Sequence, residues 1–491
     1  MSGWLPRHLF TFRLAVVTLL GLALRLAYVV HQEDREVIGD GNYYHFLARN
    51  LADGAGFINP VSYLRTGVES PDALHPPAWS AVLAVPTWLG FDSYHAHQVF
   101  GCLVGTLTVV LVGFAGRRIA GPRTGILAAL LAAVYPNLWI YEREIMSETL
   151  LFPLVALTVI LAYRFVGRPD MTRAALVGVA CGLLALTRAE QMLHLIVLLA
   201  PLVLLVGGVP LRRRAAWLAA GTAAMAVVIA PWAAYNTSRF QNPVVITTSA
   251  GHGLRLGNCE LNYYGELIGT RQRRCPDVVP LRGDPSVRDA ARGRLGREYV
   301  LDHLGRVPLA VFAKEGRTWG FWNPLQQSRL DSARNTSLGV IRAGYAAYYA
   351  IAPAAVAGAV ILRRRRVRLT PLLAFVAVVV VAVAPTWGQV RFRAAAEIPL
   401  VLLAAVAGTA LFDLVVRHVR KQHRGTASER AGSGQDPSRT RAGMLRASPR
   451  WRPNRTSGRR LHPRARSGAD ARRRRAEPRL RPPSLLRHAA A

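Results

Sequence analysis

Long apolar runs, rather than alternating apolar and polar positions, dominate the first 416 residues of the chain. A helix needs roughly 20 mostly apolar residues to cross a hydrocarbon core of about 30 Å. A spanning segment must also satisfy its own backbone hydrogen bonds, so each run is predicted to be helical. The pattern predicts an all-α polytopic membrane protein with about ten transmembrane helices, expected at residues 10–30, 95–116, 124–141, 148–166, 173–187, 190–207, 214–235, 339–362, 369–387 and 395–416.

Basic residues gather in alternate connections between these runs. Cytoplasmic connections carry an excess of Arg and Lys, so this alternation orients the helices. We expect a multi-pass protein of the cell membrane with both termini cytoplasmic. Two long segments, residues 32–94 and 236–338, then face outward, and function is expected on that face. The basic connections contain Arg117, Arg118 and Arg123; Arg164, Arg168 and Arg173; Arg212 to Arg214; Arg363 to Arg366 and Arg368; and Arg417, Arg420, Lys421 and Arg424.

Four regions follow from this topology. Residues 1–235 form an N-terminal transmembrane module that includes the first outer loop, 32–94. Residues 236–338 form an extracytoplasmic loop region, and residues 339–424 form the C-terminal transmembrane helices. Residues 425–491 are too poor in apolar clusters to fold, and we expect a disordered, basic, cytoplasmic tail.

The formal net charge of +34 resembles that of a nucleic-acid-binding protein, but its distribution argues against one. About +15 of it lies between Arg424 and Ala491, and much of the rest lies in short inner loops, as membrane topology predicts. No nucleic-acid partner is expected. Cys259 and Cys275 share one outer loop and either pair in an oxidising compartment or remain two free thiols.

The first outer segment holds the first candidate site residues. Asp40 precedes a stretch in which Tyr44, Leu47 and Leu51 share one helical face, which predicts a short amphipathic helix along the membrane surface. Asp40 is either a functional carboxylate above the bilayer or the N-cap of this helix. Further along, two prolines follow His75 and fix a rigid turn, which either positions its imidazole for function or is a surface turn with an incidental histidine.

The turn at residues 141–148 places three carboxylates and Arg143 between two spans. Glu144 and Glu148 are four residues apart, which predicts a shared helix face. Ionisable groups at membrane depth are costly and usually functional, and Glu148 lies deepest toward the next span. The alternative is that these acids cap the helix in water.

Two further outer turns carry arginines. Arg188 and Glu190 lie between the fifth and sixth spans, as a functional pair or as a local ion pair. Arg391 and Arg393 lie before the last span, where positive charge on the outer face departs from the usual distribution. Guanidinium groups bind phosphate oxygens in bidentate fashion, so a phosphate at the outer leaflet would account for them.

These motifs resemble those of bacterial GT-C fold membrane glycosyltransferases, a superfamily that includes glycosyltransferase family 39 protein mannosyltransferases and the aminoarabinose transferase of lipid A. The matching pieces span about residues 10–410. They are Gly39-Asp40 with Tyr43-Tyr44, Gly54 to Phe57, His75-Pro76-Pro77, Ser147-Glu148, Leu186 to Glu190, Pro231-Trp232 with Tyr235-Asn236, Gly257-Asn258, and Arg391-Phe392-Arg393 before Pro399.

The resemblance implies a GT-C-like helix bundle whose outer loops carry short helices. It implies a polyprenyl-phosphate-linked sugar donor and transfer at the outer face to a glycan, lipid or protein acceptor that the sequence does not identify. Asp40 matches the family's acceptor base, and Glu148 matches its second acidic position. The candidate catalytic residues are Asp40 and Glu148, and the candidate substrate-binding residues are Tyr44, His75, Arg143, Arg188, Glu190, Arg391 and Arg393.

The sequence departs from the family pattern in places. The first loop has one acid where some members carry an acidic pair, and Ala189 stands where many relatives have proline. No nucleotide or redox cofactor is needed, because the phosphate leaves as a stabilised anion. A divalent metal between phosphate and Asp40 is compatible with the chemistry, although the sequence lacks a dedicated metal cluster.

Two other functions compete with the transferase. A transporter or flippase for a lipid-linked or anionic substrate often shows inverted repeats and charges near the midplane, whereas here the charges gather at one face and no repeat is seen. A non-catalytic membrane scaffold would use the outer loops only to bind a partner.

Overall fold

The computed structural model describes residues 5–32, 34–272, 275, 282–333 and 335–432. Apart from an isolated bridge between Ile58 and Pro71, these ranges contain helices, turns and irregular segments and no strand. Residues 1–423 form one compact unit. The expected all-α class is confirmed.

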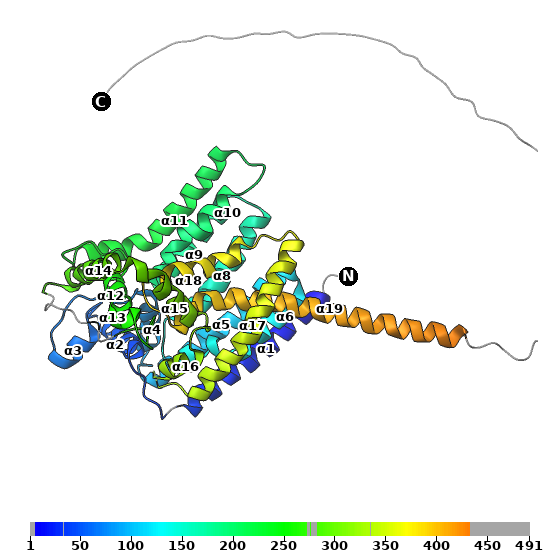
Figure 1. The fold of residues 1–491 in the computed structure, drawn as a ribbon, viewed down its shortest axis with the longest axis horizontal. Coiled ribbons are helices and arrows are strands. Elements are labelled where there is room, and N and C mark those ends of the chain that lie inside the picture. The colour runs from blue at the N-terminus through cyan, green and yellow to red at the C-terminus, as the bar shows by residue number, and fades with distance from the viewer. Residues whose placement is uncertain (1–4, 33, 273–274, 276–281, 334, 433–491) are drawn as a thin grey trace, which may run out of the picture. The chain divides into compact units, whose positions relative to one another are not determined.

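Six of the described helices are long and apolar enough to cross a membrane (Figure 1). Four shorter apolar helices accompany them, at Pro122–Val134, Met171–Thr187, Ala189–Leu204 and Thr370–Val383. Together they match the ten runs expected from the sequence, and the chain is a multi-pass membrane protein. The six long helices are α1 (Leu5–His31), α5 (Tyr94–Ala120), α8 (Glu148–Gly167), α11 (Leu211–Thr237), α17 (Leu338–Arg364) and α19 (Ala394–Gly432).

The shorter helices show where hydropathy misplaces a boundary. The third expected span, 124–141, is not one helix, because α6 (Pro122–Val134) ends before Tyr135. A 3-10 turn at Pro136–Leu138 and the short α7 (Ile140–Arg143) continue the chain. Proline cannot donate a backbone hydrogen bond, so Pro136 ends the regular helix while the sequence remains apolar.

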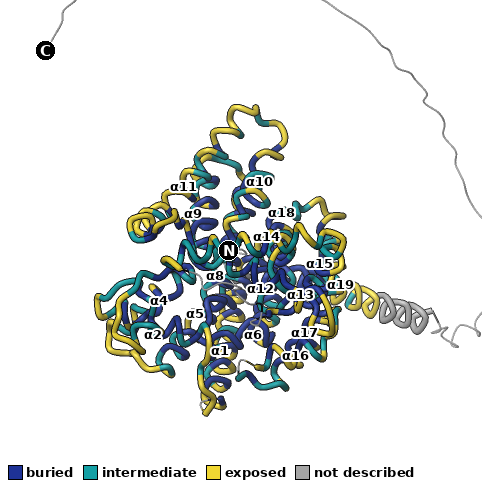
Figure 2. Tube along the Cα trace, turned by 60° about the vertical axis from the view of Figure 1, so that its left-hand side comes forward, coloured by how far each residue is buried: buried dark blue, intermediate teal, exposed yellow. Residues whose placement is uncertain are grey.

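The core of the bundle lies between the helices, where the trace is buried along α5, α6 and α8 (Figure 2). The helix α9 (Met171–Thr187) packs along α11. A Cβ at Gly178 would clash with the carbonyl oxygen of Gly221, so two glycines let these backbones touch. Small residues at such crossings permit close packing where lipid supplies no hydrophobic drive.

The two segments expected on the outer face fold into short helices. The first holds α2 (Asp40–Ala52), α3 (Pro60–Thr66) and α4 (Ala78–Trp88), and α2 packs on α4. The second holds α12 (Ala250–Gly257), α13 (Glu260–Tyr263), α14 (Pro285–Asp302), α15 (Val307–Thr318) and α16 (Pro324–Ser332).

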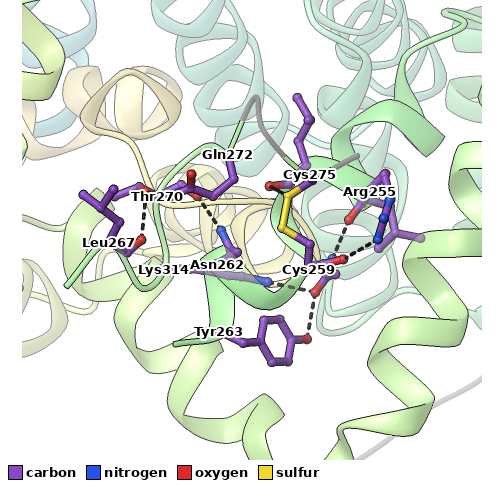
Figure 3. The surroundings of a disulfide bond; sticks show 12 residues. Arg255, Cys259, Asn262, Tyr263, Leu267, Thr270, Gln272, Cys275 and Lys314 are labelled. Carbon is purple, nitrogen blue, oxygen red and sulfur yellow. Dashed lines mark hydrogen bonds between the residues drawn. A yellow bond between two sulfur atoms is a disulfide. The ribbon is translucent and has the colours of Figure 1, made fainter. Parts of the chain in front are cut away.

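Cys259 and Cys275 form a disulfide within the second segment (Figure 3). Beside it, Lys314 donates to the side chain of Asn258 (3.1 Å) and to the carbonyl of Ala384 (3.3 Å). This buried lysine ties the disulfide-bonded loop to the end of α18 (Thr370–Val383). Of the two alternatives left by the sequence, the structure has the paired cysteines.

The last helix extends farther than the apolar run that predicts it. The run ends at about residue 416, whereas α19 continues to Gly432. The tail expected to be disordered lies, from residue 433 on, outside the described residues. The division of the chain into four regions remains a prediction.

Candidate active site

Two glycines set the position of Asp40. Gly39 has φ 66°, a conformation that favours glycine, and α2 begins immediately after it at Asp40. A Cβ at Gly41 would clash with the carbonyl oxygen of Glu144, so the first turn of α2 packs directly on the turn before α8. Asp40 makes no capping hydrogen bond and is not the N-cap of α2. Its carboxylate points elsewhere.

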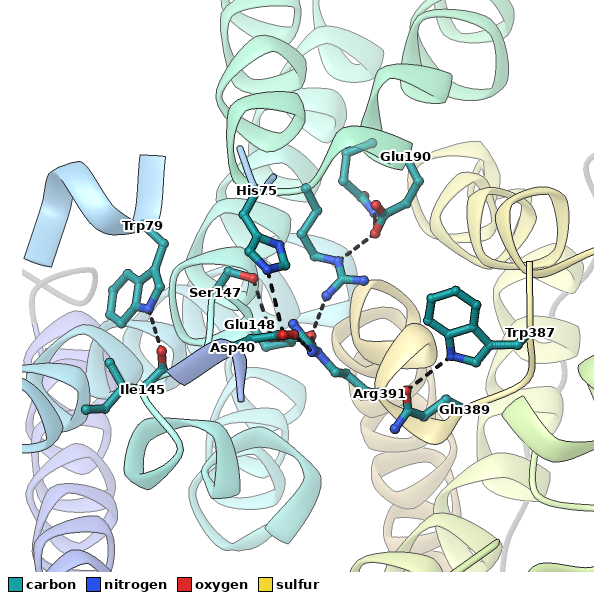
Figure 4. A network of polar contacts seen from close by, with 12 residues as sticks. Asp40, His75, Trp79, Ile145, Ser147, Glu148, Glu190, Trp387, Gln389 and Arg391 are labelled. Atoms are coloured by element: carbon teal, nitrogen blue, oxygen red, sulfur yellow. Dashed lines mark hydrogen bonds and ion pairs between the residues drawn. The ribbon is translucent and has the colours of Figure 1, made fainter. Parts of the chain in front are cut away.

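The turn before α8 does not have the predicted geometry. Glu144 follows the last residue of α7 and Ile145 has φ 53°, so Glu144 and Glu148 do not share a helix face. Thr336 donates to Glu144, whereas Glu148 begins α8 and is fully buried. The indole of Trp79 donates to the carbonyl of Ile145 (2.9 Å) and holds the turn in place (Figure 4).

A chain of ion pairs joins four segments that are far apart in sequence (Figure 4). Arg391 bonds through Nη1 to Asp40 (2.6 Å) and through Nε to Glu148. Arg188 also contacts Glu148, and its Nε bonds to Glu190 at 2.6 Å. Three carboxylates therefore share two guanidinium groups, and the Nη2 atom of each guanidinium lies outside these four ion pairs. The local pair of Arg188 and Glu190 exists, but as part of this larger cluster.

Asp40 lies at one end of this series of ion pairs, where its carboxylate is held by cationic neighbours and is not free to accept a proton. Burial alone would raise the pKa of Asp40, but the adjacent Arg391 and His75 outweigh burial and hold that pKa well below its usual range. The His75 Nε2 atom lies 3.7 Å from the Asp40 carboxylate. The ring of Tyr44 is buried and lies 5.1 Å from that of His75. In this arrangement Asp40 is ionised and forms an ion pair with Arg391.

Two cavities meet at this cluster. The larger, about 800 Å³, combines charged residues with an extended apolar wall. The smaller, about 230 Å³, is lined by Glu144 and Arg143 among others. Asp40, Arg271 and Arg391 line both cavities. The apolar wall of the larger cavity includes Leu74, Met192, Leu193, Val245, Val381, Trp387 and Phe392.

The structure places the remaining candidates unequally. Tyr44, His75, Arg188 and Glu190 line the larger cavity, and Arg143 lines the smaller one. Arg393 lies outside the cluster. Its Nε bonds to Glu397 (2.9 Å), and its guanidinium lies 3.5 Å from the centre of the Tyr348 ring. Arg391 and Arg393 therefore do not act on one cavity together.

Two charged residues near the site are not indicated by the sequence pattern. Arg271 lines both cavities, with its guanidinium 5.3 Å from the centre of the Trp387 ring, yet it lies in a segment without periodicity or motif. Arg25 lies inside α1 and bonds to the buried Glu142 at 2.8 Å. A charge within an apolar run is the signal that could have indicated Arg25; no comparable signal marks Arg271.

Comparison with known proteins agrees with this architecture. Residues 74–235 match the family model described as dolichyl-phosphate-mannose-protein mannosyltransferase. The apo oligosaccharyltransferase of Archaeoglobus fulgidus is similar over 89% of this chain and 53% of its own, at 17% identity and a TM-score of 0.52. The archaeal oligosaccharyltransferase AglB from Archaeoglobus fulgidus, in complex with an inhibitory peptide and a dolichol-phosphate, is similar over 88% and 53%, at 16% identity and a TM-score of 0.52.

ArnT from Cupriavidus metallidurans bound to undecaprenyl phosphate is similar over 83% of this chain and 78% of its own, at 15% identity and a TM-score of 0.38. No curated protein sequence matches the chain. The chain spans about half the length of the oligosaccharyltransferase chains. At these identities the likeness to the two oligosaccharyltransferase chains shows the fold alone, which is the GT-C fold. The resemblance that the sequence motifs indicate is confirmed.

Proposed function

We propose that this chain is a membrane glycosyltransferase. It moves a sugar from a polyprenyl-phosphate-linked donor to an acceptor on the outer face of the cytoplasmic membrane, with Asp40 as the base. The observation that carries the proposal is the contact between Asp40 and Arg391 at the wall shared by two cavities. One residue can accept a proton and the other can hold a leaving phosphate, and they touch although 351 positions separate them.

The larger cavity suits the lipid end of such a donor. Its apolar wall would accept isoprene units, and its charged end contains Arg391 and Arg188. Each of these guanidinium groups is already oriented by Glu148, which is fully buried. A phosphate that reaches them would bond first to the nitrogen that the carboxylates leave over on each group, and a bidentate contact with Arg391 would also need the Nη1 atom that Asp40 occupies.

The charge of the cluster explains why donor binding would activate Asp40. Three carboxylates face two guanidinium groups, so a phosphate must compete with Asp40 for Arg391. When Arg391 turns to the phosphate, Asp40 loses its main cationic partner and its pKa rises toward that of an ordinary buried carboxyl. The base is therefore unmasked when a donor is present, and this order limits loss of the sugar to water.

The chemical step follows from this arrangement. An acceptor hydroxyl or amide in the smaller cavity attacks the anomeric carbon, and its proton passes to Asp40. The bond between the anomeric carbon and the phosphate oxygen breaks, and its electron pair leaves with the polyprenyl phosphate. Arg391 stabilises the negative charge that develops on that oxygen, which is the usual source of large rate enhancements.

Glu148 takes a different role from the one its motif implies. It lines neither cavity, and its carboxylate contacts both Arg188 and Arg391. We assign it as a positioning residue that holds the phosphate-binding arginines. Arg393 also has a structural role and does not bind phosphate, because its guanidinium pairs with Glu397 and lies over the ring of Tyr348.

No step requires a metal ion here. Asp40 gives its carboxylate to Arg391 and His75, and no three His, Cys, Asp or Glu side chains gather as ligands in the part of the chain that the structure describes. The donor set does not fit a metal centre, so the mechanism uses the arginines alone for charge stabilisation.

The test is a transfer assay with purified full-length protein and a panel of polyprenyl-phosphate sugars. Native protein is expected to release sugar from one or a few of these donors. Asp40→Asn should lose turnover by about 10²–10⁴-fold, as removal of a positioned base does. Asp53→Asn is the matched control, because Asp53 is an exposed acid at the far end of the same helix. If Asp40→Asn turns over like the native chain, the assignment of the base is wrong.

A further inference from the structure

A second charged cavity lies at the opposite end of the helices that build the active site. It has a volume of about 640 Å³ and is formed by the ends of α5, α8 and α9. Four arginines line it together with one acid, Asp170, and several apolar or small residues. Its lining consists of Arg118, Leu161, Arg164, Gly167, Arg168, Asp170, Thr172, Arg173 and Leu176.

The helix α8 fixes the separation between the two sites. Glu148 at its first residue belongs to the ion-pair cluster, and Arg164 lies in its last turn. Sixteen residues of α-helix rise about 24 Å, close to the thickness of a hydrocarbon core. The helix α9 repeats this relation, because it begins at Met171 near the arginines and ends at Thr187 beside Arg188. The two sites therefore face opposite leaflets.

The cavity retains unneutralised positive charge. Asp170 already pairs with Arg173, because it accepts a hydrogen bond from the backbone N–H of Arg173 (2.8 Å) and forms an ion pair with its side chain. Arg118 crosses from α5 and donates to the carbonyl of Tyr163 at the end of α8 (3.4 Å). Among the described residues, Arg118, Arg164 and Arg168 have no carboxylate partner. Three guanidinium groups from two helix ends thus surround one hollow.

The apolar part of the lining distinguishes this hollow from a simple basic loop. Leu161 and Leu176 line the same cavity as the arginines, and Leu176 is 43% exposed. Leu161 lies on α8, which is long and apolar enough to cross a membrane, and Leu176 lies on the shorter apolar helix α9; both lie on the apolar side of the charged ends. A ligand that fits must carry a negative head and an apolar chain, in that order along the membrane normal.

We propose that this cavity is a binding site for an anionic phospholipid of the leaflet opposite the active site. Its phosphate lies between Arg118, Arg164 and Arg168, and one acyl chain lies along Leu161 and Leu176. Basic pockets between transmembrane helices bind such headgroups because several guanidinium groups and the phosphate satisfy each other's charge and hydrogen bonds. The bound lipid would fix the relative positions of α5, α8 and α9; α8 begins at Glu148 and α9 ends beside Arg188.

The experiment uses the full-length protein in nanodiscs of phosphatidylcholine alone or mixed with phosphatidylglycerol. Lipids retained on the protein are counted by native mass spectrometry after detergent release, and thermal unfolding is followed in parallel. A triple variant, Arg118→Gln with Arg164→Gln and Arg168→Gln, is compared with native protein. The control, Arg363→Gln with Arg364→Gln and Arg365→Gln, removes the same charge from exposed residues at the end of α17, in another basic connection.

Native protein should retain phosphatidylglycerol in preference to phosphatidylcholine. Each arginine near the headgroup contributes about a fivefold preference, so the triple variant should lose at least about tenfold of it. The control variant should keep its preference. If the triple variant does not fold, the single exposed Arg164→Gln should still show a loss of a few fold.

Three results would overturn the proposal. The native protein could show no preference between the two lipids. The control variant could lose as much preference as the triple variant, which would mean diffuse surface attraction. Inorganic phosphate could displace phosphatidylglycerol and stabilise the protein equally, which would mean an anion site without a lipid chain. The glycosyl-transfer assay plays no part in these readouts, so they stand apart from the proposed activity.

Discussion

If the proposed function holds, replacing Asp40 by Asn should make the protein bind polyprenyl phosphate more tightly while sugar transfer is lost. In the native structure the Asp40 carboxylate occupies Nη1 of Arg391 at 2.6 Å. A neutral amide of the same size would hold Arg391 less strongly and leave it free to turn to a phosphate. A mutation that only damaged the site would weaken both binding and turnover.

The magnitude follows from the exposure of the pair. The Asp40 side chain is 28% exposed and that of Arg391 is 10% exposed. Exposed ion pairs are worth about 0.2–1 kcal/mol, and removing one partner of a buried pair costs about 3–5 kcal/mol. For this partly buried pair about 1 kcal/mol is reasonable, which corresponds to about fivefold tighter binding.

The assay titrates polyprenyl phosphate, the leaving group, into protein in nanodiscs and measures its Kd alongside sugar release. Asp40→Asn is expected to lower the Kd about fivefold and to reduce turnover by at least about 10²-fold. Asp53→Asn should change neither quantity. A higher Kd for Asp40→Asn would refute the competition, because it would mean that Asp40 assists phosphate binding rather than opposing it.

Three further predictions concern stability. Burial raises the pKa of Glu315 to about 7, so the stability linked to its protonation is present below about pH 4.3 and is lost as the pH rises through about 7. Glu315→Gln, which still accepts a hydrogen bond from Trp319, should therefore raise the free energy of unfolding by roughly 1–2 kcal/mol at pH 8 and little at pH 4. An equal effect at both pH values would contradict this. Cys259→Ser should cost roughly 3 kcal/mol by opening a loop closed across 16 residues, and a reducing agent should shift the melting temperature of the native chain but not of this variant. Gly178→Ala should lower the free energy of unfolding by about 1–3 kcal/mol, and the melting temperature with it, because its methyl group would meet the backbone of Gly221. An unchanged melting temperature would mean that α9 and α11 separate without cost.

The fold was largely predictable because one physical rule dominates membrane segments. A spanning helix must be long, apolar and internally hydrogen-bonded, so hydropathy alone indicates the ten apolar helices. The failures occur where an apolar sequence stops being helical. Tyr135-Pro136 ends α6 inside an apolar run, and no hydropathy value records that change.

The sequence predicts which turns carry the site residues, but it does not predict which of their side chains touch. Topology places Asp40 and Arg391 on one face, but their contact depends on how α2 packs on the turn before α8. Arg391 and Arg393 look equivalent in sequence and diverge in the structure. Glu397, four residues after Arg393, is the local signal that assigns Arg393 to an internal pair. Arg271 had no such signal, because only the folding of the segment between α11 and α17 brings it to the cavities.

A transferase cleaves the bond between sugar and lipid phosphate, whereas a flippase leaves that bond intact, and a doubly labelled donor separates the two. The full-length protein is reconstituted in liposomes with a polyprenyl-phosphate sugar labelled in both the sugar and the lipid, together with candidate acceptors. The account predicts that the two labels separate, with polyprenyl phosphate accumulating in proportion to sugar transferred. Movement of both labels together across the bilayer, with the lipid-linked sugar intact, would instead identify a flippase and contradict the account.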